Sequence, residues 1–122
     1  HQGGRALRTV FSAPTLAFTR DGRSQTLWGL GGSASLRDKD LTVTVVNPHA
    51  TDPRECVIAL RGATIREGRG TVLSSTDLRA HNSFEQPDAL APHDAPVRRA
   101  AAGSLVHTFP PASVTRLQLT LA

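Results

Sequence analysis

The sequence predicts an all-β domain, built as an antiparallel β-sandwich or barrel. Around eight short segments alternate apolar and polar residues between turn residues, which is typical of strands in such folds. No stretch of about 10 to 15 residues has helical periodicity. The chain has 122 residues, which suits one domain with a core of its own. We therefore expect residues 1–122 to form a single domain.

The first forty residues predict short strands joined by tight turns. Alternating segments run from Ala6 to Ser12, from Thr15 to Thr19 and from Ser24 to Leu30. Asp21-Gly22 is a strong turn pair, because glycine tolerates positive φ. Gly31-Gly32 interrupts the pattern, which predicts a bulge or a corner before the strand resumes at residues 33–36.

The middle of the chain predicts a β-hairpin. In the run from Leu41 to Val46, the apolar residues at 41, 43 and 45 share one face and threonines occupy the other. The run from Arg54 to Leu60 alternates similarly, with Cys56 on its core-facing side. We expect the two strands to pair through a longer loop at residues 47–53.

The remaining strands flank one long irregular segment. Short strands are predicted at residues 71–73, 104–109 and 114–121, the last with leucines at every second position. Arg98 to Ala102 consists of helix formers but is too short to hold a helix alone. Residues 74–96 break the strand rhythm, and loops of this length are unusual unless they are functional or packed on something.

Composition and charge exclude several classes of function. The formal net charge is +4, and all but one of the 14 cationic residues are arginines spread along the chain, so we expect no nucleic-acid partner. No apolar run approaches the length of a membrane span, so no membrane partner is expected. A single cysteine excludes an internal disulfide. The sequence contains no methionine and begins at His1, so we expect a piece of a longer protein.

No motif for catalysis or metal binding stands out. The loop carboxylates Asp77, Glu85, Asp88 and Asp94 have no spacing that pairs them for glycosidic hydrolysis. The five histidines share no ligand spacing, and we expect one buried loop histidine and several on the surface. No phosphate-binding loop, dinucleotide fingerprint or nucleophile elbow occurs. No cofactor or metal is therefore implied.

The two residues with more specific expectations are Trp28 and Cys56. Sugar-binding modules stack rings on Trp and Tyr, but this chain has one Trp and no Tyr, and we expect Trp28 in a strand and in the core. Cys56 is expected to be a core residue within a strand, with no partner that would lower its pKa.

Four segments, in order along the chain, resemble the C-terminal region of intracellular α-L-arabinofuranosidases of glycoside hydrolase family 51. These are the strand LTVTVVNPH from Leu41, the turn IALRG from Ile58, the run TVLSSTDLRAHNSFEQPDALAP from Thr71 and PPASV from Pro110. Within the third run, the residues that match the family pattern are Leu73, Asp77, Ala80, His81, Asn82, Ser83, Phe84, Pro87, Asp88, Leu90 and Pro92. The first 40 residues match only loosely.

The resemblance implies a jelly-roll-like β-sandwich that accompanies a (β/α)8 catalytic barrel. The two catalytic glutamates of the family belong to the barrel and have no counterpart here, so no catalytic residue is assigned. We expect the long loop to contact the barrel, with Phe84 and Leu90 buried there and His81 and Asn82 bonded to the loop's own backbone. An equally weighted alternative, compatible with this contact, is that the loop closes one end of the sandwich. The candidate interface residues are His81, Asn82, Phe84, Pro87, Asp88 and Leu90.

The resemblance also implies properties of the whole enzyme. It would be a cytoplasmic homo-oligomer that hydrolyses terminal α-L-arabinofuranosides of arabinan or arabinoxylan, and its substrate would be an arabinose-containing oligosaccharide. The N-terminal segment of such enzymes tends to add strands to the sandwich, so the chain could expose a sheet edge. Two alternatives stay open, a stand-alone carbohydrate-binding module and a protein-interaction domain. The size of the native gene product would separate a domain of a larger enzyme from a free-standing one.

Overall fold

The computed structural model describes residues 1–122, which form eleven strands and no helix. It therefore contains no helix long and apolar enough to cross a membrane. The strands are β1 (Arg5–Leu7), β2 (Leu16–Arg20), β3 (Arg23–Leu27), β4 (Gly31–Arg37), β5 (Asp40–Asn47), β6 (Arg54–Ala59), β7 (Ile65–Ser74), β8 (His93–Ala95), β9 (Arg98–Ala101), β10 (Ser104–Phe109) and β11 (Ser113–Leu121).

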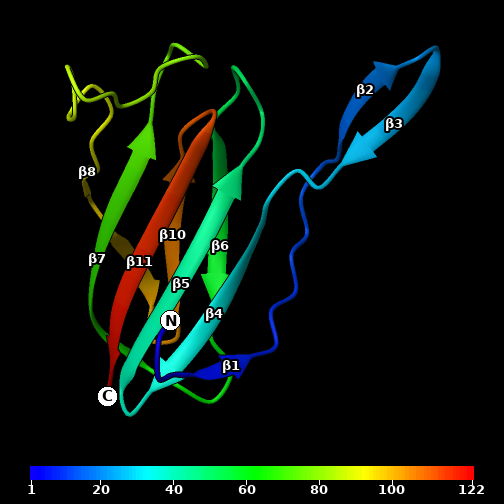
Figure 1. The fold of residues 1–122 in the computed structure, drawn as a ribbon. Helices are drawn as coiled ribbons and strands as arrows, with labels where there is room; N and C mark the ends of the chain where they lie inside the picture. Colours follow the sequence, from blue (N-terminus) through cyan, green and yellow to red (C-terminus); the bar gives the residue numbers. More distant parts are fainter.

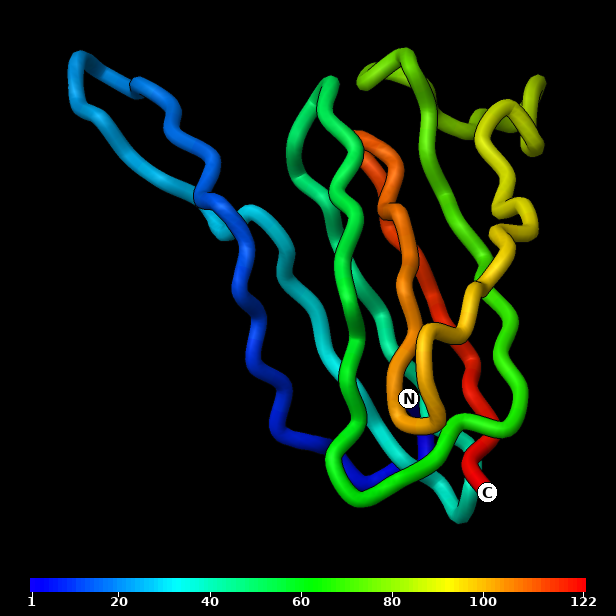
Figure 2. Tube along the Cα trace, turned by 180° about the vertical axis from the view of Figure 1, so that it is seen from behind, coloured from blue at the N-terminus to red at the C-terminus, as the bar shows by residue number.

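Two antiparallel sheets pack face to face, which confirms the predicted all-β sandwich. The larger sheet has the strand order β1-β4-β5-β11-β7-β8 and the smaller one β6-β10-β9. The larger sheet faces the viewer in Figure 1, and the smaller sheet lies in front in the reverse view of Figure 2. A separate two-stranded sheet, β2-β3, extends from one side of the sandwich.

The core lies between the two sheets and follows the alternation of the sequence. Every second side chain of β5 and β11 points inward, and β10 covers these side chains from the other sheet. The largest fully buried side chains are Leu41, Val45, Asn47, Ile65, Leu105, Phe109, Thr115, Leu117 and Leu119. The predicted inward faces of residues 41–46 and 114–121 are therefore correct, and the threonines of β5 lie on the outer face.

The predicted hairpin between residues 41–46 and 54–60 is wrong. Strand β5 pairs with β4 and β11, so both of its edges are occupied. Strand β6 instead crosses to the smaller sheet and pairs with β10, with Cys56 opposite His107. The alternation gives each strand one buried face. Two such strands can pair within one sheet or face each other across a sandwich, so the pattern alone does not determine which strands pair.

The side chain of Asn47 fixes the place where the chain crosses between the sheets. Asn47 is fully buried, and its amide nitrogen lies 3.0 Å from the carbonyl oxygen of Asp52, 3.2 Å from that of Phe109 and 3.0 Å from that of Pro110. Its amide oxygen accepts the backbone N–H of His49 at 3.1 Å. One side chain thus joins the end of β5, the crossing loop and the end of β10.

The glycine pair at residues 31 and 32 does not form the predicted bulge or corner. Both residues lie inside β4 and pair in regular register with Val46 and Val45 of β5. A Cβ atom at Gly32 would collide with the backbone carbonyl of Thr44, so glycine is needed for close approach of the strands. Glycine at position 32 therefore reflects the close approach of two strand backbones and not a change in the direction of the chain.

Several element boundaries also differ from the prediction. The first strand ends at Leu7 instead of Ser12, while β7 starts six residues earlier than the predicted 71–73. The helix formers at residues 98–101 make strand β9, and β8 lies within the segment 74–96 that was expected to be irregular. The turn at Asp21-Gly22 is confirmed, with φ of 51° and 72°.

We predict that Asn47→Asp destabilises the fold by about 2–4 kcal/mol, because it removes the buried donor and places negative charge against three carbonyl oxygens. Urea unfolding followed by circular dichroism measures the loss. The matched control is Asn82→Asp, where the exposed amide can be replaced by water and the expected loss is below about 1 kcal/mol. Equal losses in the two variants would contradict the assigned role of Asn47.

Candidate functional site

The loop between β7 and β8 is held in shape by its own hydrogen bonds. The His81 ring nitrogen Nδ1 lies 2.9 Å from the carbonyl oxygen of Arg79. The Asn82 side chain donates to the carbonyl of Leu90 at 2.9 Å and accepts the Leu90 N–H at 2.7 Å. These are the loop-backbone bonds predicted for His81 and Asn82, and the two bonds between Asn82 and Leu90 close the segment 82–90 into a ring.

Turn-forming side chains support the start and the middle of this loop. Asp77 accepts the backbone N–H of Arg79 at 2.9 Å, and Ser83 accepts that of Gln86 at 3.1 Å. Hydrogen bonds from its own backbone and from Ser83 lower the pKa of Glu85. Glu85 is therefore an ionised turn residue on the surface and shows no feature of a glycosidase acid.

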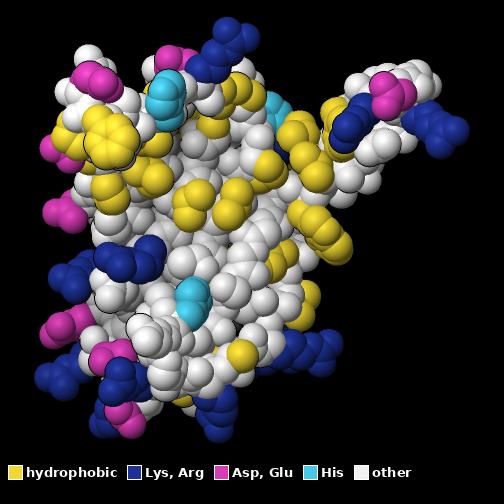
Figure 3. Space-filling model, viewed as in Figure 1, with side chains coloured by type: hydrophobic (Ala, Val, Ile, Leu, Met, Phe, Trp, Pro, Cys, Tyr) yellow, Lys and Arg dark blue, Asp and Glu magenta, His cyan; other side chains and the backbone are white.

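The same loop presents apolar side chains to solvent. Phe84 is completely exposed and Leu78 is 67% exposed, whereas Leu90 is half-buried. On the adjacent sheet face, Val46 of β5 and Val114 of β11 form an exposed cross-strand pair. Figure 3 shows hydrophobic side chains gathered at this end of the face, beside the loop. Pro87 and Asp88 of the predicted interface set are exposed as well.

A second surface feature is a polar hollow of about 410 Å³ on the outer face of the larger sheet. It crosses three neighbouring strands, β5, β11 and β7. We call it the sheet-face hollow. The lining residues are Asp40, Leu41, Thr42, Glu67, Gly68, Arg69, Gln118, Leu119 and Thr120.

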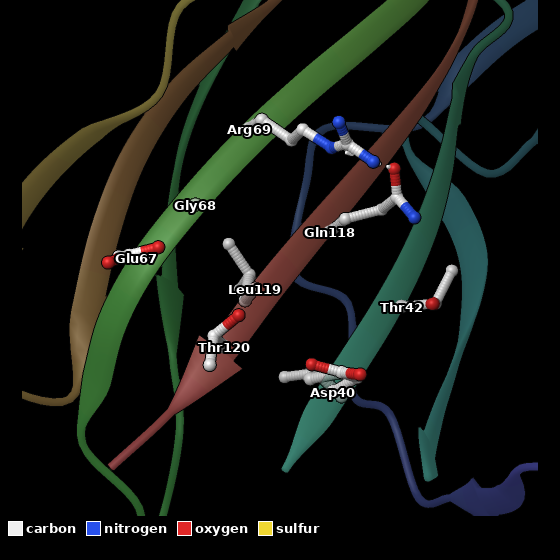
Figure 4. A pocket seen from close by; sticks show the side chains of 9 residues that line it. Asp40, Thr42, Glu67, Gly68, Arg69, Gln118, Leu119 and Thr120 are labelled. Atoms are coloured by element: carbon white, nitrogen blue, oxygen red, sulfur yellow. Dashed lines mark hydrogen bonds between the residues drawn. The ribbon is translucent and has the colours of Figure 1, made fainter.

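Strand register explains how this hollow is assembled. Thr120 of β11 is opposite Asp40 on one side and Glu67 on the other. Two residues along, Gln118 accepts a hydrogen bond from Nε of Arg69 at 3.2 Å. Figure 4 shows Arg69 turned toward Gln118, and Thr120 between the two acidic residues. Asp40 and Glu67 are thus about two interstrand spacings apart, roughly 10 Å.

Sequence reasoning missed this pair of acids. It considered only the loop carboxylates Asp77, Glu85 and Asp88 together with Asp94, and the structure shows no ion pair or metal-type cluster among them. The outward direction of Asp40 and Glu67 follows from the period of two in each strand. That they line the same hollow depends on β11 lying between β5 and β7, and this strand order cannot be predicted from the sequence.

The histidines differ from expectation in one respect. The buried one is His107, which lies in strand β10 and packs edge-on against Phe109 at a centroid distance of 4.8 Å, and not in a loop. His49 forms an ion-pair contact with Asp52, with Nε2 and Oδ2 3.2 Å apart. His1 contacts the hydroxyl of Ser35 at 2.7 Å on the outer sheet face.

The prediction for Trp28 is wrong, whereas the prediction for Cys56 is confirmed. Trp28 follows the end of β3 and is 76% exposed, so the prediction of a core strand residue is wrong, because the hairpin that precedes it projects from the sandwich. Cys56 lies in β6 and packs against the core, as predicted. Burial raises the pKa of its thiol, which does not suit a nucleophile.

The family of the chain is established by a sequence-family comparison. The model of the α-L-arabinofuranosidase C-terminal domain matches residues 1–113. The chain belongs to this family. A search of the curated proteins returned no significant match. The resemblance inferred from residues 41–114 is thereby confirmed.

Solved structures of glycoside hydrolases share the fold. An arabinofuranosidase of family 51 from Xanthomonas axonopodis pv. citri superposes with a TM-score of 0.75 at 21% identity, over 88% of this chain and 21% of that chain. The α-L-arabinofuranosidase from Thermotoga maritima gives 0.72 at 20% identity, over 94% and 25%. A family 51 enzyme from Bifidobacterium longum gives 0.74 at 21%, over 88% and 21%.

The chain spans only about a fifth to a quarter of these structures. At such identity the likeness concerns the fold of the sandwich.

We predict that His107 makes the stability of the domain dependent on pH. Desolvation lowers the pKa of His107, against a hydrogen bond with the backbone of Pro96 that raises it. The unfolded chain therefore binds this proton more readily, and stability falls as pH decreases below the ordinary histidine pKa of about 6.5. Unfolding free energies at a series of pH values between about 7.5 and 5 measure the slope.

His107→Leu supplies the control, because leucine cannot take up a proton. The unfolding free energy of the unaltered chain should rise with pH more steeply than that of His107→Leu, by at most about 1.4 kcal/mol per pH unit. Identical slopes would show that His107 titrates equally in the folded and unfolded chains.

Proposed function

We propose that residues 1–122 form the non-catalytic sandwich domain of an α-L-arabinofuranosidase and pack on a (β/α)8 catalytic barrel of the same protein. The family assignment and the small share of the related structures that the chain covers support this proposal. The loop of residues 74–96 is the proposed contact. Its role is to cover apolar surface of the barrel and to restrain the barrel's orientation within a homo-oligomer.

The observation that carries the proposal is Phe84. A completely exposed phenylalanine gains nothing from folding of this domain, yet its loop is held by the paired hydrogen bonds of Asn82 with Leu90. A large apolar side chain on an ordered loop is the usual anchor of a protein interface. Val46 and Val114 extend the same apolar surface onto the sheet.

The β6 edge of the smaller sheet supports a second contact with the rest of the protein. Strand β6 pairs only with β10, and Val57 on it is 63% exposed. Beside this edge lies a mostly apolar cavity of about 270 Å³ between the sheets, next to residues 7–12. An additional strand from elsewhere in the protein would satisfy the edge and cover this opening.

Hydrolysis itself is assigned to the remainder of the protein. By the resemblance, the two glutamates of the retaining mechanism are barrel residues. Asp40 and Glu67 do not replace them, because these acids are roughly 10 Å apart and a retaining pair needs about 5–5.5 Å. We propose that the whole protein removes terminal α-L-arabinofuranosyl groups from arabinan or arabinoxylan in the cytoplasm. The chain alone should then hydrolyse no arabinofuranoside.

One observation favours the second candidate, a stand-alone carbohydrate-binding module. Trp28 is 76% exposed, so its ring face is available for stacking on a sugar. Loss of arabinoxylan binding in Trp28→Ala would favour this function.

Phe84→Ala tests the domain proposal in two settings. In the isolated chain we expect a change in unfolding free energy within about 0.5 kcal/mol, because the side chain is exposed. In the full-length protein we expect a loss of about 2–4 kcal/mol, because a buried anchor is removed from the interface. Thermal and urea unfolding of both forms, together with hydrolysis of an aryl arabinofuranoside, give the comparison.

The matched control is Leu27→Ala, which truncates an exposed apolar residue on the projecting hairpin. It should leave the interface unchanged. The same small effect of Phe84→Ala in both settings would overturn the proposed contact. Absence of arabinofuranoside hydrolysis by the full-length protein would overturn the proposed enzyme.

A further inference from the structure

The sheet-face hollow is assembled on the most firmly paired part of the sandwich. Its three strands are neighbours in the larger sheet, and β11 is paired along almost its whole length to β5 on one side and β7 on the other. The leucines at its floor, Leu41 and Leu119, are buried in the core. The outward side chains are therefore mounted on rigid backbone, which is the arrangement that preserves a binding geometry.

The composition of the hollow indicates which ligands fit. Only two of its nine lining residues are hydrophobic, which does not suit an apolar ligand. Asp40 and Glu67 outnumber the one cation, Arg69, which disfavours an anion. No group of three or more potential ligand side chains is present for a metal ion. A neutral molecule with many hydroxyl groups is compatible with all three observations.

The donors and acceptors are arranged for such a molecule. The Asp40 and Glu67 carboxylates accept hydrogen bonds only, and they flank the Thr120 hydroxyl, which donates or accepts. Arg69 uses Nε to hold Gln118, which leaves its terminal guanidinium nitrogens as oriented donors. Sugar hydroxyl groups both donate and accept, so adjacent hydroxyls could use the two kinds of partner together.

We propose that the sheet-face hollow binds a neutral oligosaccharide, with hydroxyl groups donating to Asp40 and Glu67 and accepting from Arg69. The choice of an arabinose-containing chain as the sugar rests on the proposed function. Without an aromatic platform the hollow binds weakly, and its effect would be to keep a polymeric substrate near the catalytic domain by raising its local concentration. This site is separate from Trp28, which does not line it.

The test is a titration of the isotope-labelled 122-residue chain with a linear arabino-oligosaccharide, followed by amide chemical shifts. We expect saturable shifts confined to residues 40–42, 67–69 and 118–120. The double variant Asp40→Asn with Glu67→Gln should weaken binding by about tenfold or more, because it removes two charged acceptors. Asp21→Asn, which changes an exposed acid on the projecting hairpin, is the control and should bind like the unaltered chain.

Three results would overturn the proposal. These are no shifts at concentrations of tens of millimolar, shifts that map elsewhere, or binding that survives the double variant and is lost in Trp28→Ala. A xylo-oligosaccharide titrated in parallel determines whether the hollow prefers arabinose or accepts neutral sugar chains in general. Since hydrolysis is assayed on the full-length protein, failure of sugar binding and failure of the proposed enzyme give different signals.

Discussion

The buried amide of Asn47 is the interaction on which the arrangement of the sandwich depends. The two connections at this end, β5–β6 and β10–β11, carry backbone carbonyls that lie outside the strands and need partners of their own. Asn47 contacts carbonyls of both connections, and the backbone N–H of Ala112 donates to the carbonyl of His49 at 2.8 Å in the same place. Because a buried carbonyl without a partner is costly, this network holds the two sheets in one relative position.

Both surface features follow from that position. The order β5-β11-β7 is possible only because β6 leaves the larger sheet after β5. As a result, Asp40 of β5 and Glu67 of β7 lie on either side of β11. The loop after β7 extends from the same end of the sandwich at which Asn47 lies (Figure 1). The domain therefore offers an apolar surface at one end and a polar hollow on its sheet face, and these differ in chemistry and in the partners that they suit.

Much of the fold could be predicted from the sequence, because solvent-exposed and buried faces of a strand impose a period of two. The faces of β5 and β11 were predicted correctly for this reason. The turn at Asp21-Gly22 was predicted from turn chemistry, because glycine tolerates positive φ. The exposed position of Trp28 was not predictable, since tryptophan is usually a core residue but this one follows a hairpin without a covering sheet. The hollow was missed because Asp40 and Glu67 are far apart in sequence.

The sequence by itself determined the class of the fold, the inward faces of β5 and β11, the loop bonds of His81 and Asn82 and membership of the family. All of these depend on local alternation, turn chemistry or a run of matching residues. Only the tertiary structure decided which strands pair, where the buried histidine lies and which acids share a surface. Strand partners are selected by the packing of whole sheets and by buried polar groups such as Asn47, and that selection leaves no mark in the spacing of residues along one strand.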